Sequence, residues 1–211
     1  MDAIKKESST TTYKEIHYDD RLGGNGQRLR TDDADAHRLF RDAESRCCGY
    51  LLGGASGTLV HSLLMANSQL HGIVLDLPDV VPSATAAAAA IGLAERSRAL
   101  AGDFFTHVPQ GDIYLLKHIL HDWDDAEAVR ILQGCRDAMR PGGRVVVIEN
   151  LLGEIGEPGI APLIDLNMMV LLTGRERTLA EFCGLLKDAG LRFSKSTPIR
   201  PPIAVIEAVA A

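Results

Sequence analysis

Short apolar runs alternate with segments of helical period over most of this chain, and this alternation restricts the fold more than any other feature. The runs lie at residues 73–75, 113–116 and 145–148, and another covers 203–209. Such uninterrupted apolar runs are typical of strands that are covered on both faces. Strands that alternate with helices predict a doubly wound, mostly parallel α/β sheet.

Helices are expected between these strands. Residues 57–67 and the alanine-rich residues 83–91 are two of them. A third covers 124–139, where apolar side chains recur with the helical period. Asp124 and Glu127 resemble a capping box at its start, and the Pro-Gly-Gly that follows predicts its end.

Two further segments near the C-terminus have helical character. Thr178 and Glu181 have the spacing of a capping box, which predicts a helix over 179–189. The stretch 165–172 is apolar and contains two methionines. A helix of this composition is usually part of a core, although methionine also lines pockets for flat apolar ligands.

The first 48 of the 211 residues differ from the rest in composition and in hydrophobic pattern. They hold nine Lys/Arg and ten Asp/Glu, and their few apolar residues follow no period. Because such a stretch buries too little to offset its ordering entropy, we predict a largely disordered segment over 1–48. One short helix around 35–46 is compatible with the sequence. The folded domain is predicted over 49–211.

Composition excludes several classes of protein. The net charge of −6 argues against nucleic acid as the main partner. An apolar run near 18 residues is absent, which argues against a membrane span, and the N-terminus lacks the apolar core of a secretory signal. The four cysteines show neither a Cys-X-X-Cys pair nor zinc-ligand spacing, so reduced thiols in a cytoplasmic protein are expected.

Polar groups follow the predicted strands, at the edge of the sheet where α/β proteins bind ligands. A glycine-rich turn spans 53–57, and Asp76 comes 19 residues after Gly57, at the end of the next strand. An acidic residue there can accept both ribose hydroxyls of a nucleoside-type cofactor. The alternative for Asp76 is a capping carboxylate beside Leu77.

The segment 116–125 contains two histidines, His118 and His121, among acidic residues. We expect no metal, because the spacing places no third ligand. A general base is the better use of one imidazole, whose ordinary pKa of about 6.5 suits proton removal near neutrality. For His118 a packing or capping role is preferred. Glu149, which ends the most apolar strand, could orient an imidazole or cap the next segment.

Five motifs together resemble the S-adenosylmethionine-dependent O-methyltransferases of the caffeate, flavonoid and hydroxyindole type, which include bacterial natural-product enzymes. They are LDLP at 75–78, GDFF at 102–105, LKHILHDW at 116–123, RPGG at 140–143 and GRERT at 174–178. The resemblance implies a Rossmann-like class I methyltransferase fold with an antiparallel C-terminal strand. It further implies S-adenosyl-L-methionine as cofactor and a small aromatic hydroxyl compound as acceptor.

The resemblance also implies roles for individual residues. His121 would be the general base, flanked by two glutamates, and Met168 would pack on the acceptor ring. The glutamates are Glu149 and Glu176. The cofactor-binding residues would be Gly53, Asp76, Asp103, Phe104 and Lys117. A phenol has a pKa near 10, so its proton must be removed as the oxygen attacks the methyl carbon, and no metal is required for this.

The sequence departs from the family pattern in two respects. Leu51 replaces an acidic residue and Ala55 replaces a glycine in the cofactor loop. Losing a charge-assisted partner is expected to weaken cofactor binding by about 1.5–3 kcal/mol. In addition, the family's homodimers are built by a helical N-terminal domain, and residues 1–48 are too short and polar to form one. A non-catalytic remnant is therefore the alternative to an enzyme, and a nicotinamide dehydrogenase is a more distant one.

Overall fold

The computed structural model describes residues 48–153, 156, 159–171 and 173–211. The disordered segment predicted for 1–48 and the short helix at 35–46 lie outside the described residues, except that Cys48 opens the first strand. Among the described helices, none is both long and apolar enough to cross a lipid bilayer.

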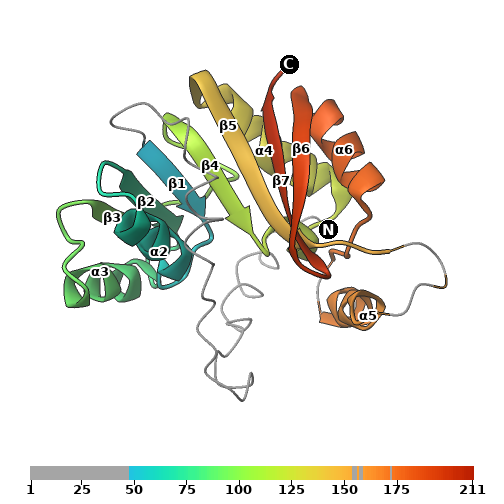
Figure 1. The fold of residues 1–211 in the computed structure, drawn as a ribbon, viewed down its shortest axis with the longest axis horizontal. Coiled ribbons are helices and arrows are strands. Elements are labelled where there is room, and N and C mark those ends of the chain that lie inside the picture. Colours follow the sequence, from blue (N-terminus) through green and yellow to red (C-terminus); the bar gives the residue numbers. More distant parts are fainter. Residues whose placement is uncertain (1–47, 154–155, 157–158, 172) are drawn as a thin grey trace, which may run out of the picture.

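One seven-stranded sheet forms the centre of the molecule, in the order β3-β2-β1-β4-β5-β7-β6 (Figure 1). Strands β1 to β5 pair in parallel, whereas β7 runs antiparallel to both β5 and β6. This confirms the predicted mostly parallel sheet. The strands are β1 (Cys48–Leu52), β2 (His71–Asp76), β3 (Ser97–Ala101), β4 (Gly111–Lys117), β5 (Met139–Asn150), β6 (Leu191–Arg200) and β7 (Ile203–Ala210).

Strand β7 runs antiparallel to its neighbours, as the sequence predicted, but one further strand beyond it was not predicted. The additional strand is β6, which lies at the edge of the sheet and pairs only with β7 among the described strands. Most of its side chains are exposed. An edge strand with few buried positions lacks the apolar run that identifies the central strands, which explains why its sequence does not reveal it.

Helices cover both faces of the sheet. On one face, α4 and α6 pack on side chains such as Tyr114 and Leu116. On the other, α2 and α3 pack on Ile113 and Leu115, the alternate residues of the same strand. The helices are α2 (Thr58–Ala66), α3 (Val81–Ala90), α4 (Asp125–Asp137), α5 (Ala161–Leu171) and α6 (Leu179–Asp188), with a 3₁₀ turn, η2 (Leu120–Asp122).

The helix starts follow the sequence closely. The Thr178 hydroxyl accepts from the Glu181 amide, and the Glu181 carboxylate accepts from the Thr178 amide, which confirms the capping box of α6. The Asp124 carboxylate accepts from the Glu127 amide at 2.8 Å and caps α4. This helix ends at Asp137, two residues earlier than predicted, because Met139 already belongs to β5.

Helix α5 lies apart from the two helical layers, below the sheet in Figure 1. Leu163, Leu166, Met169 and Val170 are all largely exposed, the last of them by 82%. The interpretation of 165–172 as a core helix is therefore wrong over the residues that the structure describes. Composition alone predicted burial, but the sheet is already covered by other helices.

Candidate active site

The parallel pairing brings the predicted site residues to one edge of the sheet. In the register of β1, β2, β3 and β4, Leu52 lies beside Leu75 and Leu116, and Asp76 lies beside Ala101. The segments that follow these four strands therefore start side by side. Asp76 and Lys117 end β2 and β4, and Gly53 and Asp103 follow β1 and β3 within two residues, so the four residues that the sequence placed at strand ends share this edge.

The Asp76 carboxylate holds the glycine loop in place. Its Oδ2 accepts a hydrogen bond from the Ala55 amide at 2.9 Å, and its Oδ1 accepts from the Leu77 amide at 2.7 Å. Gly53 has a φ of 64°, and its amide donates to the Leu75 carbonyl at 3.0 Å. Asp76 does not cap helix α3, whose N-cap is Val80 without a side-chain hydrogen bond, and it binds loop amides instead. A carboxylate has about four acceptor positions, so two remain for a ligand.

Leu51 supports the same loop by packing. The side chain is 3% exposed and belongs to the apolar cluster under α2. It fills the space beside Gly54, where a Cβ atom would collide with its Cδ2 atom. A carboxylate in this position would be buried among apolar side chains. The loop of this chain is therefore held by apolar contact and by Asp76, and it does not depend on an acid at position 51.

Ala55 occupies the left-handed region, with a φ of 46°. A residue with a Cβ atom is strained in this region by about 1–2 kcal/mol, and glycine, which has no Cβ atom, is not. Glycine also loses about 0.4–1 kcal/mol more chain entropy on folding. We predict that Ala55→Gly raises the free energy of unfolding by about 0.5–1 kcal/mol, measured by urea denaturation. In Ala86→Gly, an exposed site inside α3, a loss is expected instead. Equal losses in both variants would refute the strain at Ala55.

The segment after β3 combines an acid with two aromatic rings. The Asp103 carboxylate is exposed and accepts from the Phe105 amide at 2.8 Å. Phe104 is only 9% exposed and meets Trp123 edge to face, with ring centroids 6.4 Å apart. A Cβ atom on Gly53 would lie 3.8 Å from the Phe104 ring. Phe104 therefore borders the glycine loop from within the core.

His121 lies on η2 and points one ring nitrogen at a buried carboxylate. Its Nδ1 atom is 2.9 Å from Oε1 of Glu176 and 3.7 Å from Oε2 of Glu149. Its Nε2 atom is 3.4 Å from Oδ1 of Asp122. Both glutamates are fully buried, whereas the His121 side chain is 11% exposed. The three predicted catalytic residues, from segments 28 and 55 residues away from His121, thus meet in one cluster.

Of the two roles considered for Glu149, capping is found at the turn that carries His121 and not at the segment that follows β5. Its Oε1 atom accepts hydrogen bonds from the amides of Ile119 and Leu120, each at 2.9 Å, and so caps the turn that carries His121. Its Oε2 atom faces His118 at 3.5 Å and His121. A single carboxylate therefore fixes the backbone of the turn and contributes negative charge beside the imidazole.

Glu176 is held from two sides. Its Oε1 atom accepts from Asn150 at 3.2 Å, and its amide donates to Oδ1 of Asp165 on α5 at 2.8 Å. Gly174, two residues earlier, packs on the backbone of the turn so closely that a Cβ atom would overlap the His121 carbonyl. This close approach requires glycine and brings Glu176 within reach of the ring.

Arg177 is a structural residue that sequence reasoning missed. It is fully buried, and its guanidinium donates to the carbonyls of Leu120 and Trp123, both at 2.7 Å, and to Asp125 at 2.9 Å. Leu120 begins the η2 turn and Trp123 directly follows it, so these bonds connect the two ends of the turn. The GRERT motif could have revealed this role, because it places Arg177 next to the predicted catalytic residue Glu176. An arginine in that position is expected to have buried partners.

The charges of the cluster shift several pKa values. Burial disfavours protonated His121, but the hydrogen bond with Glu176 and the charges of Glu149, Asp122 and Glu176 outweigh it and raise the pKa of His121 to about 9. Burial is the main cause that raises the pKa of Asp122 to about 6. For Glu149, burial is opposed and outweighed by His118, His121 and the Ile119 amide, which hold its pKa below the ordinary value.

The shift of His121 also affects stability. Because its folded-state pKa lies above the ordinary value of 6.5, the imidazolium stabilises the fold fully below about pH 6.5. This contribution is lost as the pH rises through about 9.

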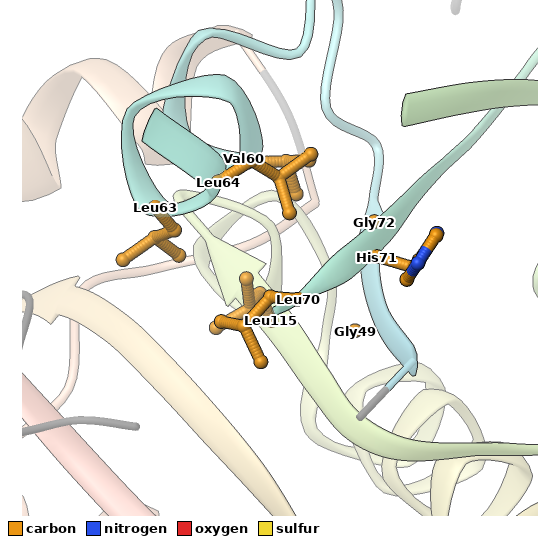
Figure 2. Close-up of a pocket in the computed structure, with 8 residues that line it drawn as sticks. All are labelled: Gly49, Val60, Leu63, Leu64, Leu70, His71, Gly72 and Leu115. Atoms are coloured by element: carbon orange, nitrogen blue, oxygen red, sulfur yellow. The ribbon is translucent and has the colours of Figure 1, made fainter. Parts of the chain in front are cut away.

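Of two hollows among the described residues, one lies away from the His121 cluster and one borders the segment before Glu176. Figure 2 shows a cavity of about 10 Å³ at the amino ends of β1 and β2, lined by apolar side chains such as Val60, Leu64 and Leu115. It is no larger than one water molecule and lies away from the polar strand ends. An open hollow of about 410 Å³ borders α5 and the segment before Glu176, with Met169 in its wall. Met168 is half-buried on α5 and does not line this hollow.

Known proteins similar to this chain include several O-methyltransferases and an N,N-dimethyltransferase of Streptomyces davaonensis. The O-methyltransferase domain family matches residues 47–192. The mitomycin biosynthesis 6-O-methyltransferase of Streptomyces lavendulae is 42% identical over 159 residues, which are 74% of this chain and 45% of the relative. The chain spans about half the length of the curated relatives it matches.

Solved structures agree with the sequence comparison. The mitomycin 7-O-methyltransferase MmcR superposes with a TM-score of 0.77 and 37% identity over 85% of this chain and 54% of the other. NcsB1 from neocarzinostatin biosynthesis, solved with S-adenosyl-L-homocysteine and 1,4-dihydroxy-2-naphthoic acid, gives a TM-score of 0.73 and 34% identity, over 85% and 57% of the two chains. The Rossmann-like methyltransferase fold that the motifs predicted is therefore confirmed. On the match over most of its length, this chain belongs to the O-methyltransferase domain family.

Proposed function

We propose that this chain transfers a methyl group from S-adenosyl-L-methionine to the hydroxyl oxygen of a small aromatic metabolite, with His121 as the general base. The observation that carries the proposal is the imidazole itself. Its Nδ1 atom is fixed by buried Glu176 at 2.9 Å, and the ring keeps an exposed fraction of 11%. A base that is oriented by a carboxylate and still reachable matches the chemistry of phenol deprotonation.

The strand ends fit the proposed cofactor. Asp76 keeps acceptor positions for ribose hydroxyls, and Gly53 brings backbone without a Cβ atom to the edge of β1. Asp103 and Phe104 would hold the adenine, and Lys117 would reach the cofactor from the end of β4. When bound, S-adenosyl-L-methionine supplies a methyl group already activated by the sulfonium. The residues of the chain then have to align the acceptor oxygen and remove its proton.

In this mechanism the proton of the phenol moves to Nε2 of His121. Glu176 and Glu149 stabilise the imidazolium that results, because their carboxylates face Nδ1 at 2.9 and 3.7 Å. The same contacts raise the pKa of His121. The ring of the acceptor would rest on Met168.

We predict that kcat/KM for methyl transfer rises about tenfold per pH unit toward about pH 9, because only the neutral imidazole accepts a proton. Ionisation of the acceptor would give a similar profile. Glu176→Gln separates the two, since it removes the carboxylate bound to Nδ1 and should move the profile to lower pH. An unchanged profile in this variant would assign the pH dependence to the acceptor. The measurement is initial rate against pH for both proteins.

Calorimetric titration with S-adenosyl-L-homocysteine tests the proposal as a whole, followed by a panel of phenols with methyl-labelled cofactor. Saturable binding and labelled methyl ethers are expected. Absence of binding at millimolar ligand would leave a non-catalytic remnant, the alternative from the sequence. The cytoplasmic location that the sequence predicts remains a proposal.

A further inference from the structure

Two imidazoles and a carboxylate converge beneath the η2 turn. His118, His121 and Glu149 each offer one ligand atom, and these atoms lie within 4.8 Å of one another. Oε2 of Glu149 is 3.5 Å from Nδ1 of His118 and 3.7 Å from Nδ1 of His121. Around a tetrahedral ion with bonds of about 2.1 Å, neighbouring ligand atoms lie about 3.4 Å apart. Small side-chain movements would therefore complete the coordination.

The polar atoms that face this space lack hydrogen bonds. Among the described residues, Nδ1 of His118 and the Oε2 atoms of Glu149 and Glu176 are buried without a hydrogen-bond partner. Glu149 and Glu176 are fully buried. A buried carboxylate oxygen without a hydrogen-bond donor is unfavourable, and a cation between His118, His121 and Glu149 would relieve this cost at Oε2 of Glu149 and at Nδ1 of His118.

The backbone holds the second imidazole in position. His118 has a φ of 53°, a left-handed conformation that is uncommon for residues other than glycine. Its amide donates to the Ile148 carbonyl at 3.1 Å, and its ring lies 5.3 Å from that of His121 between centroids. The strained backbone thus brings the two rings together.

The donor set indicates which ion fits. Two neutral imidazoles and the carboxylates of Glu149 and Glu176 carry a net charge of −2, which a divalent cation neutralises. Glu176 Oε1 is already hydrogen-bonded to His121 and Asn150, so the fourth position of a tetrahedral ion would be left to a water molecule. Imidazole nitrogen with few carboxylates suits zinc and its neighbours, whereas magnesium and calcium prefer oxygen donors alone.

We propose that His118, His121 and Glu149 form a site for a divalent transition-metal ion, Zn²⁺ above all, whose occupation inhibits the chain. The inhibition rests on the proposed function, but the site does not. An ion on Nδ1 of His121 leaves the single proton of the neutral ring on Nε2. That nitrogen is then a donor and can no longer accept a proton from the acceptor.

Binding is tested with the metal alone, on the full chain freed of metal by a chelator. We expect saturable calorimetric binding of Zn²⁺, and Co²⁺ should produce the visible absorption of low-symmetry, four-coordinate cobalt. His118→Asn retains a residue that tolerates positive φ and removes one ligand, so Zn²⁺ affinity should fall tenfold or more. His107→Asn, at an exposed histidine, should bind as the parent does. Equal affinity in parent and His118→Asn, or loss in both variants, would overturn the site.

Inhibition is tested separately, by comparing each variant with and without Zn²⁺. The parent and His107→Asn should lose activity with the metal and recover it with chelator, while His118→Asn should need at least tenfold more Zn²⁺. Inhibition of His118→Asn at the parent concentration would overturn the inhibitory role. If the chain proves inactive, the proposed function fails, and the cobalt spectrum with the two variants still decides the site.

Discussion

Replacing His121 by glutamine is expected to lower kcat for methyl transfer by about 10²–10⁴-fold, the range over which a positioned general base acts. Glutamine preserves the approximate volume and a hydrogen-bonding group toward Glu176, but it cannot accept the acceptor's proton at neutral pH. Cofactor affinity should remain, because the Asp76 and Gly53 segments make their own contacts. The measurements are steady-state kinetics with labelled cofactor and calorimetry with S-adenosyl-L-homocysteine.

His107→Gln provides the matched control for this experiment. His107 is exposed and follows the Asp103 turn, outside the cluster around His121. It should retain the parent rate. Turnover of His121→Gln within tenfold of the parent would show that His121 is not the base. A parallel loss of cofactor affinity and thermal stability would show instead that His121 is structural.

Arg177→Met is predicted to lower the free energy of unfolding by about 3–5 kcal/mol, the usual result of removing one member of a buried charged network. The fully buried guanidinium satisfies the carbonyls of Leu120 and Trp123. Methionine fills part of the volume but removes the guanidinium donor from both carbonyls, and the Leu120 carbonyl then keeps only the Trp123 amide at 3.4 Å. The measurement is urea denaturation of the full chain near neutral pH. A loss of kcat in the folded fraction should accompany it, because the same carbonyls fix the turn that carries His121.

Arg175→Met is the control, because its guanidinium is 38% exposed and pairs with Glu181 and Asp125 at the surface. Exposed pairs contribute about 0–1 kcal/mol, so this variant should unfold almost as the parent does. Similar stability losses in both variants would refute the special role of the buried arginine. Arg177→Lys should fall between the two, since lysine keeps the charge but lacks the planar fork.

The central fold could be predicted because its signal is local. The runs at 73–75, 113–116 and 145–148 are buried on both faces and became β2, β4 and β5. Strand β6 was missed because an edge strand needs few apolar residues. Helix α5 was misjudged because burial depends on what else occupies the sheet, which composition does not record.

The site likewise contains residues that the sequence predicts and residues that it does not. Spacing along the chain suffices for the glycine loop and Asp76, which follow neighbouring parallel strands. It does not suffice for Glu176, which lies 55 residues from His121, and only the resemblance to a family suggested that pair. The double use of Glu149 and the burial of Arg177 depend on side-chain directions across the fold. A metal was not expected because spacing placed no third ligand, whereas the fold brings Glu149 close to both His118 and His121.

The hydrogen bond between the Glu176 amide and Asp165 ties α5 to the buried acid–base pair. The outward residues of this helix, such as Leu166 and Val170, make little contact with the core. Substitutions there can therefore accumulate without disturbing the proton-transfer apparatus, as long as Asp165 is retained. In the proposed enzyme, the outward face of this helix could change in sequence while the position of Glu176 beside His121 is kept.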